Sequence, residues 1–141
     1  MSNNFSMNDS VGAAANSAKK ILVVDDTLTV AELIQEMLLN FGHQGEVCLT
    51  VEEALTRFEP GKYDLVITDY TMPRMNGVEF AKAIRLKSPD QLILLITGST
   101  FSMADSAARQ LPVNATLQKP FSVREFQQSL TDLFAPERVS A

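Results

Sequence analysis

The stretch KKILVVDD at residues 19–26 decides the fold of this chain. Four consecutive apolar residues, Ile21 to Val24, follow two lysines and are followed directly by Asp25 and Asp26. A short apolar run of this kind is typical of a buried strand in a parallel sheet. The sequence therefore predicts a strand that brings two carboxylates to one end of a sheet.

Three further apolar runs also end on a polar side chain. They are 65–68 before Asp69, 92–96 before Thr97, and 115–118 before Lys119. Patterns typical of helices separate the runs, which is the order that a parallel sheet with crossover helices requires. Because the carboxyl ends of such strands share one crevice, where ligands bind, we expect these polar side chains to meet there.

The alternation of strands and helices predicts a doubly wound α/β fold with five parallel strands and five helices. The remaining strand is expected in the alternating stretch 44–49. The helices are expected over about 29–41, 50–58, the stretch after Asn76, 102–110 and the stretch after Ser122. Thr50, Asn76 and Ser122 each stand three residues before a glutamate, which is the pattern of a capping box.

Length and composition fit one folded domain with a short tail at each end. The chain has 141 residues, of which 45% are hydrophobic and 21% charged, as in ordinary globular domains. Residues 1–18, rich in Asn, Ser and Ala, have too few large apolar groups to form a core and are expected to be disordered. Residues 19–135 are expected to form the domain, and residues 136–141 a C-terminal tail.

Charge and hydropathy exclude two classes of partner. With 17 acidic against 12 basic residues and a net charge of -5, the chain has no basic surface for nucleic acid. No window reaches the ~18 apolar residues of a membrane helix, and the N-terminus does not resemble a signal peptide. We therefore expect a cytoplasmic protein that neither binds nucleic acid directly nor inserts into a membrane.

The single cysteine and the single histidine are expected to have no chemical role. Cys48 lies in an alternating stretch and is interpreted as a small buried apolar group. His43 follows a glycine that ends a helix, and we expect it at the surface, with no metal or phosphohistidine role.

The polar side chains expected in the crevice have the chemistry of a phosphate site. Carboxylates about 4 Å apart repel one another by several kcal/mol, and a divalent cation relieves that repulsion. Oxygen ligands of this kind suit Mg²⁺, which keeps waters that a phosphate can replace. Asp69 stands alone at a strand end and is the candidate nucleophile, whereas Asp25 and Asp26 are better placed to hold metal. Lys119 and Thr97 would bind the phosphoryl oxygens.

Four fragments of the chain, taken in order, resemble the response-regulator receiver domain of two-component signalling. They are VVDD ending at Asp26, TDYTMPRMNG around Asp69, Thr97 after its apolar run, and KPF at 119–121. The resemblance covers residues 19–135 and is specific because all four fragments fall at predicted strand ends. It implies a flavodoxin-like five-stranded sheet.

The resemblance also implies a role for each polar residue of the crevice. The matches are Asp69 as phosphoacceptor, Asp25 and Asp26 with Asp69 as carboxylate ligands of Mg²⁺ or Mn²⁺, the Thr71 backbone carbonyl as a further metal ligand, Thr97 as switch hydroxyl, and Lys119 as phosphate-binding lysine. The Lys119–Pro120 bond is expected to be cis, as is typical of the family.

The function implied by the resemblance is that of a single-domain response regulator. A histidine kinase or a histidine phosphotransfer protein would supply the phosphoryl group, and a downstream protein effector would bind the modified form. The chain would be a switch that assists its own phosphorylation and dephosphorylation, not an enzyme with a separate substrate.

Two alternatives stay open, and one position departs from the family pattern. Thr116 stands where the family often has a tyrosine or phenylalanine, which puts the usual aromatic switch in doubt. The chain could be an interaction module that keeps the fold but signals without phosphate, or the receiver part of a larger hybrid kinase or regulator. A phosphatase of the aspartyl-phosphate type is disfavoured because Thr71, not a second acid, follows two residues after Asp69.

Overall fold

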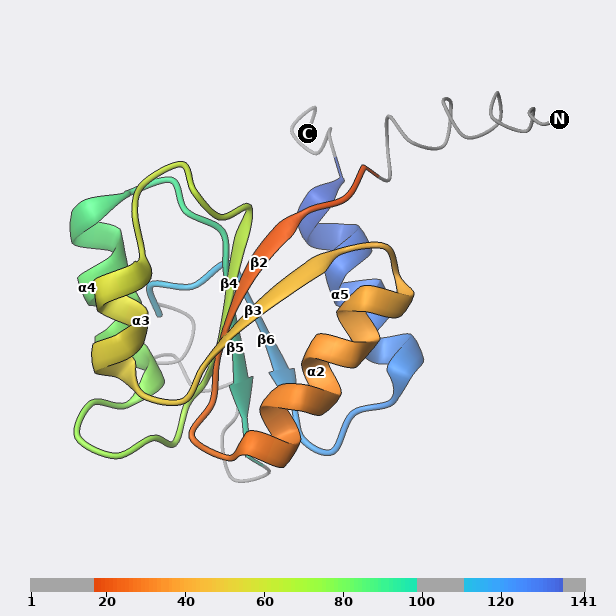
Figure 1. Cartoon of the computed structure of the whole chain (residues 1–141), viewed down its shortest axis with the longest axis horizontal. Helices are drawn as coiled ribbons and strands as arrows, with labels where there is room; N and C mark the ends of the chain where they lie inside the picture. Colours follow the sequence, from red (N-terminus) through yellow and green to blue (C-terminus); the bar gives the residue numbers. More distant parts are fainter. Residues whose placement is uncertain (1–16, 99–110, 136–141) are drawn as a thin grey trace, which may run out of the picture.

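The computed structural model describes residues 17–98 and 111–135, which contain one five-stranded parallel sheet with helices on both of its faces (Figure 1). The strands are β2 (Lys20–Val24), β3 (Gln44–Cys48), β4 (Leu65–Asp69), β5 (Ile93–Thr97) and β6 (Ala115–Gln118). Their order across the sheet is β3-β2-β4-β5-β6. All four neighbouring pairs are parallel, which confirms the predicted doubly wound sheet.

Four helices lie within the described residues. They are α2 (Leu28–Asn40), α3 (Val51–Arg57), α4 (Gly77–Lys87) and α5 (Val123–Phe134). The fifth predicted helix, at 102–110, lies outside the described residues, as do most of the expected tail at 1–18 and the tail at 136–141. No helix in the described part of the chain is long and apolar enough to cross a membrane.

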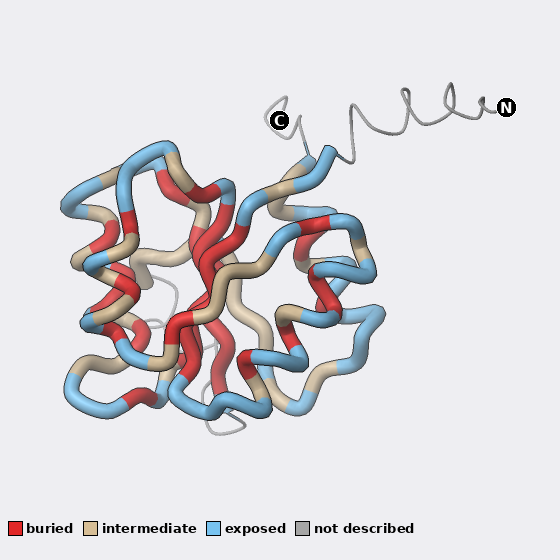
Figure 2. Tube along the Cα trace, viewed as in Figure 1, coloured by how far each residue is buried: buried red, intermediate tan, exposed pale blue. Residues whose placement is uncertain are grey.

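The core consists of two apolar layers, one on each face of the sheet. Alternate residues of β2 point to opposite layers: Ile21 and Val23 pack with residues of α2 and α5, whereas Leu22 and Val24 pack with residues of α3 and α4. Strands β4 and β5 are buried along their whole length, and exposed residues lie mainly in the loops and on the helices (Figure 2). This burial on both faces explains why the strand sequences are continuous apolar runs.

The predicted capping boxes at Asn76 and Ser122 are confirmed, and the one at Thr50 is only half formed. Thr50 Oγ1 accepts a hydrogen bond from the Glu53 N–H at 3.0 Å. The Glu53 carboxylate, however, accepts from the Leu49 N–H and pairs with the Arg57 guanidinium at 2.9 Å instead of reaching back to the Thr50 N–H. Arg57 thus draws the glutamate away from its expected partner.

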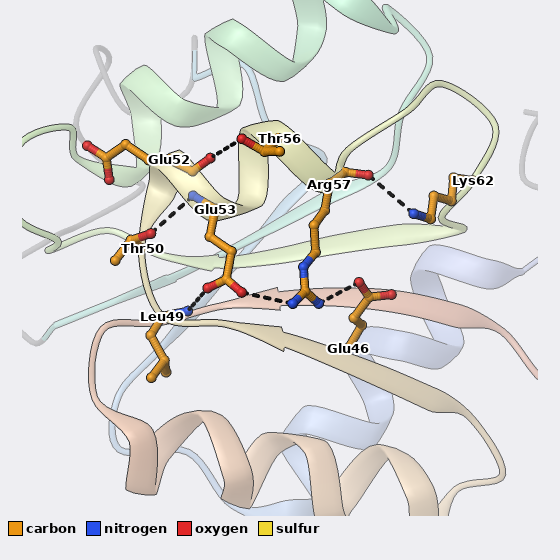
Figure 3. A network of polar contacts seen from close by, with 8 residues as sticks. All are labelled: Glu46, Leu49, Thr50, Glu52, Glu53, Thr56, Arg57 and Lys62. Carbon is orange, nitrogen blue, oxygen red and sulfur yellow. Dashed lines mark hydrogen bonds and ion pairs between the residues drawn. The ribbon is translucent and has the colours of Figure 1, made fainter.

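Arg57 also joins α3 to the edge strand β3, as Figure 3 shows. Its Nη1 lies 2.8 Å from Glu46 Oε2, while its Nη2 holds Glu53. The backbone carbonyl of Arg57 accepts a hydrogen bond from Lys62 Nζ at 3.4 Å. One guanidinium therefore fixes the orientation of a short helix relative to the strand that precedes it.

The prediction that His43 lies at the surface is wrong. The residue is only 9% exposed, and its Nδ1 accepts a hydrogen bond from the Lys19 N–H at 3.0 Å. Its ring lies edge-on to Phe134, with the ring centroids 5.8 Å apart. Gly42, at a φ of 87°, reverses the chain after α2 and thereby directs the next residue inward. Burial of the ring and the nearby Lys19 charge lower the pKa of His43.

The interpretation of Cys48 as a buried apolar group is confirmed. Its side chain has no exposed surface, and it packs with Val24 and Val51 in the layer under α3 and α4. Burial raises the pKa of the thiol to about 11, so the thiolate that reacts or binds metal does not form at neutral pH.

Candidate functional site

Three carboxylates meet where the order of the strands reverses. Asp25 and Asp26 follow β2, and Asp69 ends the neighbouring strand β4, in a register that pairs Val24 with Thr68. One carboxylate oxygen from each of the three residues lies within 4.8 Å of the other two. The predicted convergence of these side chains is therefore confirmed. It occurs at the topological switch point, where doubly wound sheets bind their ligands.

Asp25 is the most deeply buried carboxylate of this cluster. The residue is 2% exposed; its Oδ1 accepts the Thr27 N–H at 2.9 Å, and its Oδ2 is buried with no hydrogen-bond partner in the described part of the chain. Burial raises the pKa of Asp25, and the charges of Asp69 and Asp26 raise it further, against the opposing effects of the Thr27 N–H and Lys119. A buried carboxylate oxygen without a partner is the atom that a cation would satisfy.

Lys119 is the cation that the fold itself supplies. Its Nζ lies 3.0 Å from Asp69 Oδ1. The Lys119 N–H donates to the Thr97 carbonyl at 2.8 Å, and the Lys119–Pro120 bond is cis, as expected. The backbone at the end of β6 is thus fixed against β5 while the side chain reaches the acidic cluster.

Thr97 is the last residue of β5 and is 2% exposed. Its register partner is Gln118, the residue before Lys119, and Asp69 pairs with Ile96, the residue before Thr97. The structure therefore places Thr97 between the strands that carry Asp69 and Lys119, at the same end of the sheet. The role of its hydroxyl remains a prediction, as does that of the Thr71 carbonyl in the loop after Asp69.

Gly77, the last residue of the fragment TDYTMPRMNG, has a part in the site that the sequence analysis did not assign to it. Its N–H donates to the Tyr70 carbonyl at 2.8 Å, which folds the loop after Asp69 back onto the strand end. A Cβ at this position would collide with the Asp69 carbonyl oxygen and would lie 2.7 Å from Leu95 Cδ1. The signal available in the sequence was a glycine in the first turn of a helix, where it has no propensity advantage.

Arg74, in the same loop, has an unusual backbone conformation. Its φ is 71°, and the Met75 N–H donates across it to the Pro73 carbonyl at 2.8 Å, which describes a γ-turn. The Arg74 guanidinium lies 3.1 Å from Glu52 Oε2 at the start of α3. This exposed ion pair connects the loop to α3, but a pair so exposed stabilises the loop only weakly.

The donor set fits a hard divalent cation. It consists of carboxylate oxygens only, two of the three residues are buried, and one buried oxygen has no other partner among the described residues. Such oxygen ligands suit Mg²⁺ or Mn²⁺ rather than a softer metal. The adjacent ammonium of Lys119 makes the same place suitable for an anionic group next to the cation.

The chain is thus an α/β domain whose doubly wound sheet holds three carboxylates and a lysine at its switch point. A family model described as the response regulator receiver domain matches residues 21–131, and the chain belongs to this family. The chain is therefore a receiver domain of two-component signal transduction.

Three relatives illustrate the match. The chain is 31% identical over 130 residues to the chemotaxis protein CheY-3 of Vibrio cholerae, covering 86% of this chain and 96% of that protein. It is 30% identical over 123 residues to the alkaline phosphatase synthesis transcriptional regulatory protein PhoP of Bacillus subtilis, covering 87% of this chain but only 51% of that protein. The solved structure of the response regulator TrrA from Thermotoga maritima, in complex with Mg²⁺ and BeF, is 36% identical, with a TM-score of 0.72 and coverage of 82% and 98% of the two chains.

Proposed function

We propose that Asp69 accepts a phosphoryl group from the phosphohistidine of a sensor kinase or a histidine phosphotransfer protein, in a reaction that depends on Mg²⁺ or Mn²⁺. The observation that supports this most strongly is the position of Asp69, whose carboxylate is grouped with Asp25 and Asp26 while its Oδ1 lies 3.0 Å from Lys119 Nζ. The TrrA structure, with its Mg²⁺ and BeF, supports the same assignment by similarity.

In this proposal each residue has a separate task. An Asp69 carboxylate oxygen attacks phosphorus, the bond from phosphorus to the histidine nitrogen breaks, and the electron pair of that bond returns to the imidazole. Lys119 turns from the Asp69 carboxylate to an oxygen of the transferred group, and the Thr97 hydroxyl donates to another. Such transfer needs mainly positioning and neutralisation of charge.

Asp25, Asp26 and the Thr71 carbonyl would hold the cation beside Asp69. A bound divalent cation would neutralise the charge that collects on the phosphoryl oxygens. The protein residues would position the cation, and the cation would provide a partner for the buried Oδ2 of Asp25, which has no hydrogen-bond partner among the described residues. No separate substrate is turned over, so the chain acts as a switch that assists its own modification and its reversal.

The output is the binding of a downstream protein effector. Phosphorylation shifts the population between two conformations, and an effector that binds one of them more tightly responds to the shift. Thr116, in β6, replaces the usual aromatic residue, so the conformational change must use other side chains. The chain spans about half the length of PhoP but nearly all of CheY-3, so a receiver within a longer regulator is the alternative organisation.

The test is the intact mass of the protein after incubation with acetyl phosphate and Mg²⁺. We expect the mass to increase by one phosphoryl group. This increase should be absent when EDTA is present and in the Asp69→Asn variant. The exposed Asp90, outside the cluster, provides the matched control, so Asp90→Asn should gain the group as the parent does. Absence of the adduct, together with no binding of beryllofluoride by fluorine NMR, would contradict the proposal and favour a module that works without phosphate.

A further inference from the structure

Strand β3 is one edge of the sheet, and the direction of its backbone groups is known from its register. The Gln44 N–H donates to the Lys19 carbonyl at 2.9 Å, and the Cys48 carbonyl accepts from the Asp25 N–H at 3.2 Å. Since both backbone groups of a residue in a parallel strand point to the same side, the N–H and carbonyl of Gly45 and Val47 point away from the sheet.

Side chains close this edge at both ends but leave a gap between them. The Gly45 carbonyl accepts from Gln35 Nε2 of α2 at 2.8 Å. At the other end, the Leu49 N–H donates to Glu53 Oε1 at 3.3 Å, a contact drawn in Figure 3. Neither the Gly45 N–H nor the two backbone groups of Val47 have a partner in residues 17–98 or 111–135. Unpaired edge groups of this kind are a template for another strand.

A groove of about 810 Å³ runs between this edge and α2. One wall of the groove is tightly packed, because α2 approaches β3 closely at Gly45, where a Cβ would lie 3.0 Å from Leu38 Cδ1. The side chain of Leu39 is 69% exposed beside it, so the groove offers an apolar contact next to the free backbone groups. The exposed carboxylates of Glu32 and Glu36 stand along its α2 side.

We propose that this groove binds an extended, basic segment of a partner protein, which adds to β3 as a further strand. Main-chain hydrogen bonds to Gly45 and Val47 would give the affinity, and lysine or arginine side chains of the segment would lie beside Glu32 and Glu36. A second copy of the chain is disfavoured as the occupant because it would bring the same carboxylates to its own acidic groove. This surface is distinct from the phosphoryl site and does not depend on it.

The test is a titration of the full-length, ¹⁵N-labelled protein with a blocked hexapeptide of alternating lysine and valine. We expect chemical-shift changes, and slower hydrogen exchange, at the Gly45 and Val47 amides. The same peptide with glutamate in place of lysine should leave both unchanged at low salt. Raising the salt should weaken binding of the lysine peptide, since the attraction is between exposed charges.

Two variants separate the backbone contribution from the charge contribution. Val47→Pro removes an N–H that makes no bond within the sheet, which an edge strand tolerates, and should abolish binding of the lysine peptide. Glu36→Lys reverses an exposed charge on a helix and should weaken that binding about threefold or more. Glu59→Lys, at an exposed carboxylate outside the groove, is the matched control and should bind as the parent does.

Three results would overturn the proposal. One is equal binding of the glutamate peptide, and another is a set of shifts that leaves Gly45 and Val47 unaffected. The third is a concentration-dependent dimer by sedimentation velocity that Glu36→Lys alters, because a second copy would then be the occupant. The charge-reversal variant keeps the test decisive if Val47→Pro does not fold.

Discussion

Lys119 and Asp69 form an ion pair with Nζ and Oδ1 3.0 Å apart, although a whole strand, β5, lies between the strands that carry them. The lysine crosses the end of β5 to reach the acidic cluster. It provides positive charge to three grouped carboxylates, and it contacts Oδ1 of Asp69, the proposed phosphoacceptor. The pair is thus both a stabilising contact and a competitor of the proposed ligand.

Lys119→Ala should therefore lower the stability of the protein much more in the absence of metal than in its presence. Without a divalent cation, loss of the ammonium leaves Asp69 with two neighbouring carboxylates, and the free energy of unfolding should fall by about 1 kcal/mol. With saturating Mg²⁺ most of that loss should disappear. Urea unfolding with EDTA and with Mg²⁺ measures both, and Lys82→Ala, at an exposed lysine outside the site, should show neither effect. An equal loss in both conditions would show that the ion pair is only structural.

Asp25→Asn should stabilise the metal-free protein at neutral pH. Because the folded pKa of Asp25 is raised, the folded state holds its proton more tightly than the unfolded state does. The contribution of Asp25 to stability is then greatest in acid and decreases as the pH rises from about 4, the ordinary range of the group, through the raised pKa. Removing the ionisation should therefore raise the free energy of unfolding at pH 7.

The measurement is urea unfolding of Asp25→Asn and the parent at pH 4 and pH 7 without metal. The difference in free energy of unfolding between the two proteins should be larger at pH 7 than at pH 4. Addition of Mg²⁺ should stabilise only the parent. The conclusion fails if the two proteins keep a constant difference across this range. Asp90→Asn serves again as the matched control for the loss of one carboxylate.

Gly77→Ala should disturb the phosphoryl site without touching any of its charged groups. The added Cβ collides with the Asp69 carbonyl oxygen and lies 2.9 Å from Tyr70 Cα, so backbone must move. We expect a loss of about 2 kcal/mol in the free energy of unfolding and slower phosphorylation by acetyl phosphate. Gly98→Ala is the control, because its Cβ would meet no described atom within 4 Å. Parent-like stability and rate in Gly77→Ala would contradict the close contact.

His43 should make the protein less stable in acid. Its pKa is lowered, so below the ordinary value near 6.5 the unfolded state takes up the proton more readily than the folded state does. Protonation also removes the acceptor for the Lys19 N–H. The nearby charges are Lys19, which opposes protonation, and Asp64, which favours it.

The free energy of unfolding should thus fall as the pH drops from about 6.5 to about 5. His43→Asn, whose side-chain oxygen can replace Nδ1 as acceptor, should reduce this slope. His43 is the only histidine in the chain, which simplifies the assignment. An unchanged slope in the variant would assign the pH dependence to carboxylates instead.

The strands and the polar residues at their ends could be predicted because both depend on local sequence. A run such as Ile21–Val24 has few alternatives to a buried strand, and parallel order then brings Asp25, Asp69 and Lys119 to one end. The contacts that were missed depend on how the chain folds back on itself in three dimensions. His43 is buried by Phe134 of α5, and Gly77 is needed because of the Asp69 backbone. Local patterns contain no information on such neighbours.

The half-formed capping box shows a second limit of local patterns. Thr50 and Glu53 have the right spacing, but the Glu53 carboxylate has a stronger partner in Arg57 one turn later. A charged hydrogen bond to a guanidinium competes with a bond to a backbone N–H. Spacing alone cannot decide between two partners that both lie within reach.

The strand order has a consequence for synthesis of the chain on the ribosome. Asp25 and Asp26 emerge early, but β4 must form beside β2 before Asp69 joins them, and Lys119 arrives only with the last strand of the sheet. A nascent chain therefore has two acidic residues long before it has the assembled cluster. Binding of a divalent cation at this cluster would therefore report the pairing of β4 with β2, whereas the contact of Lys119 with Asp69 would report completion of the sheet.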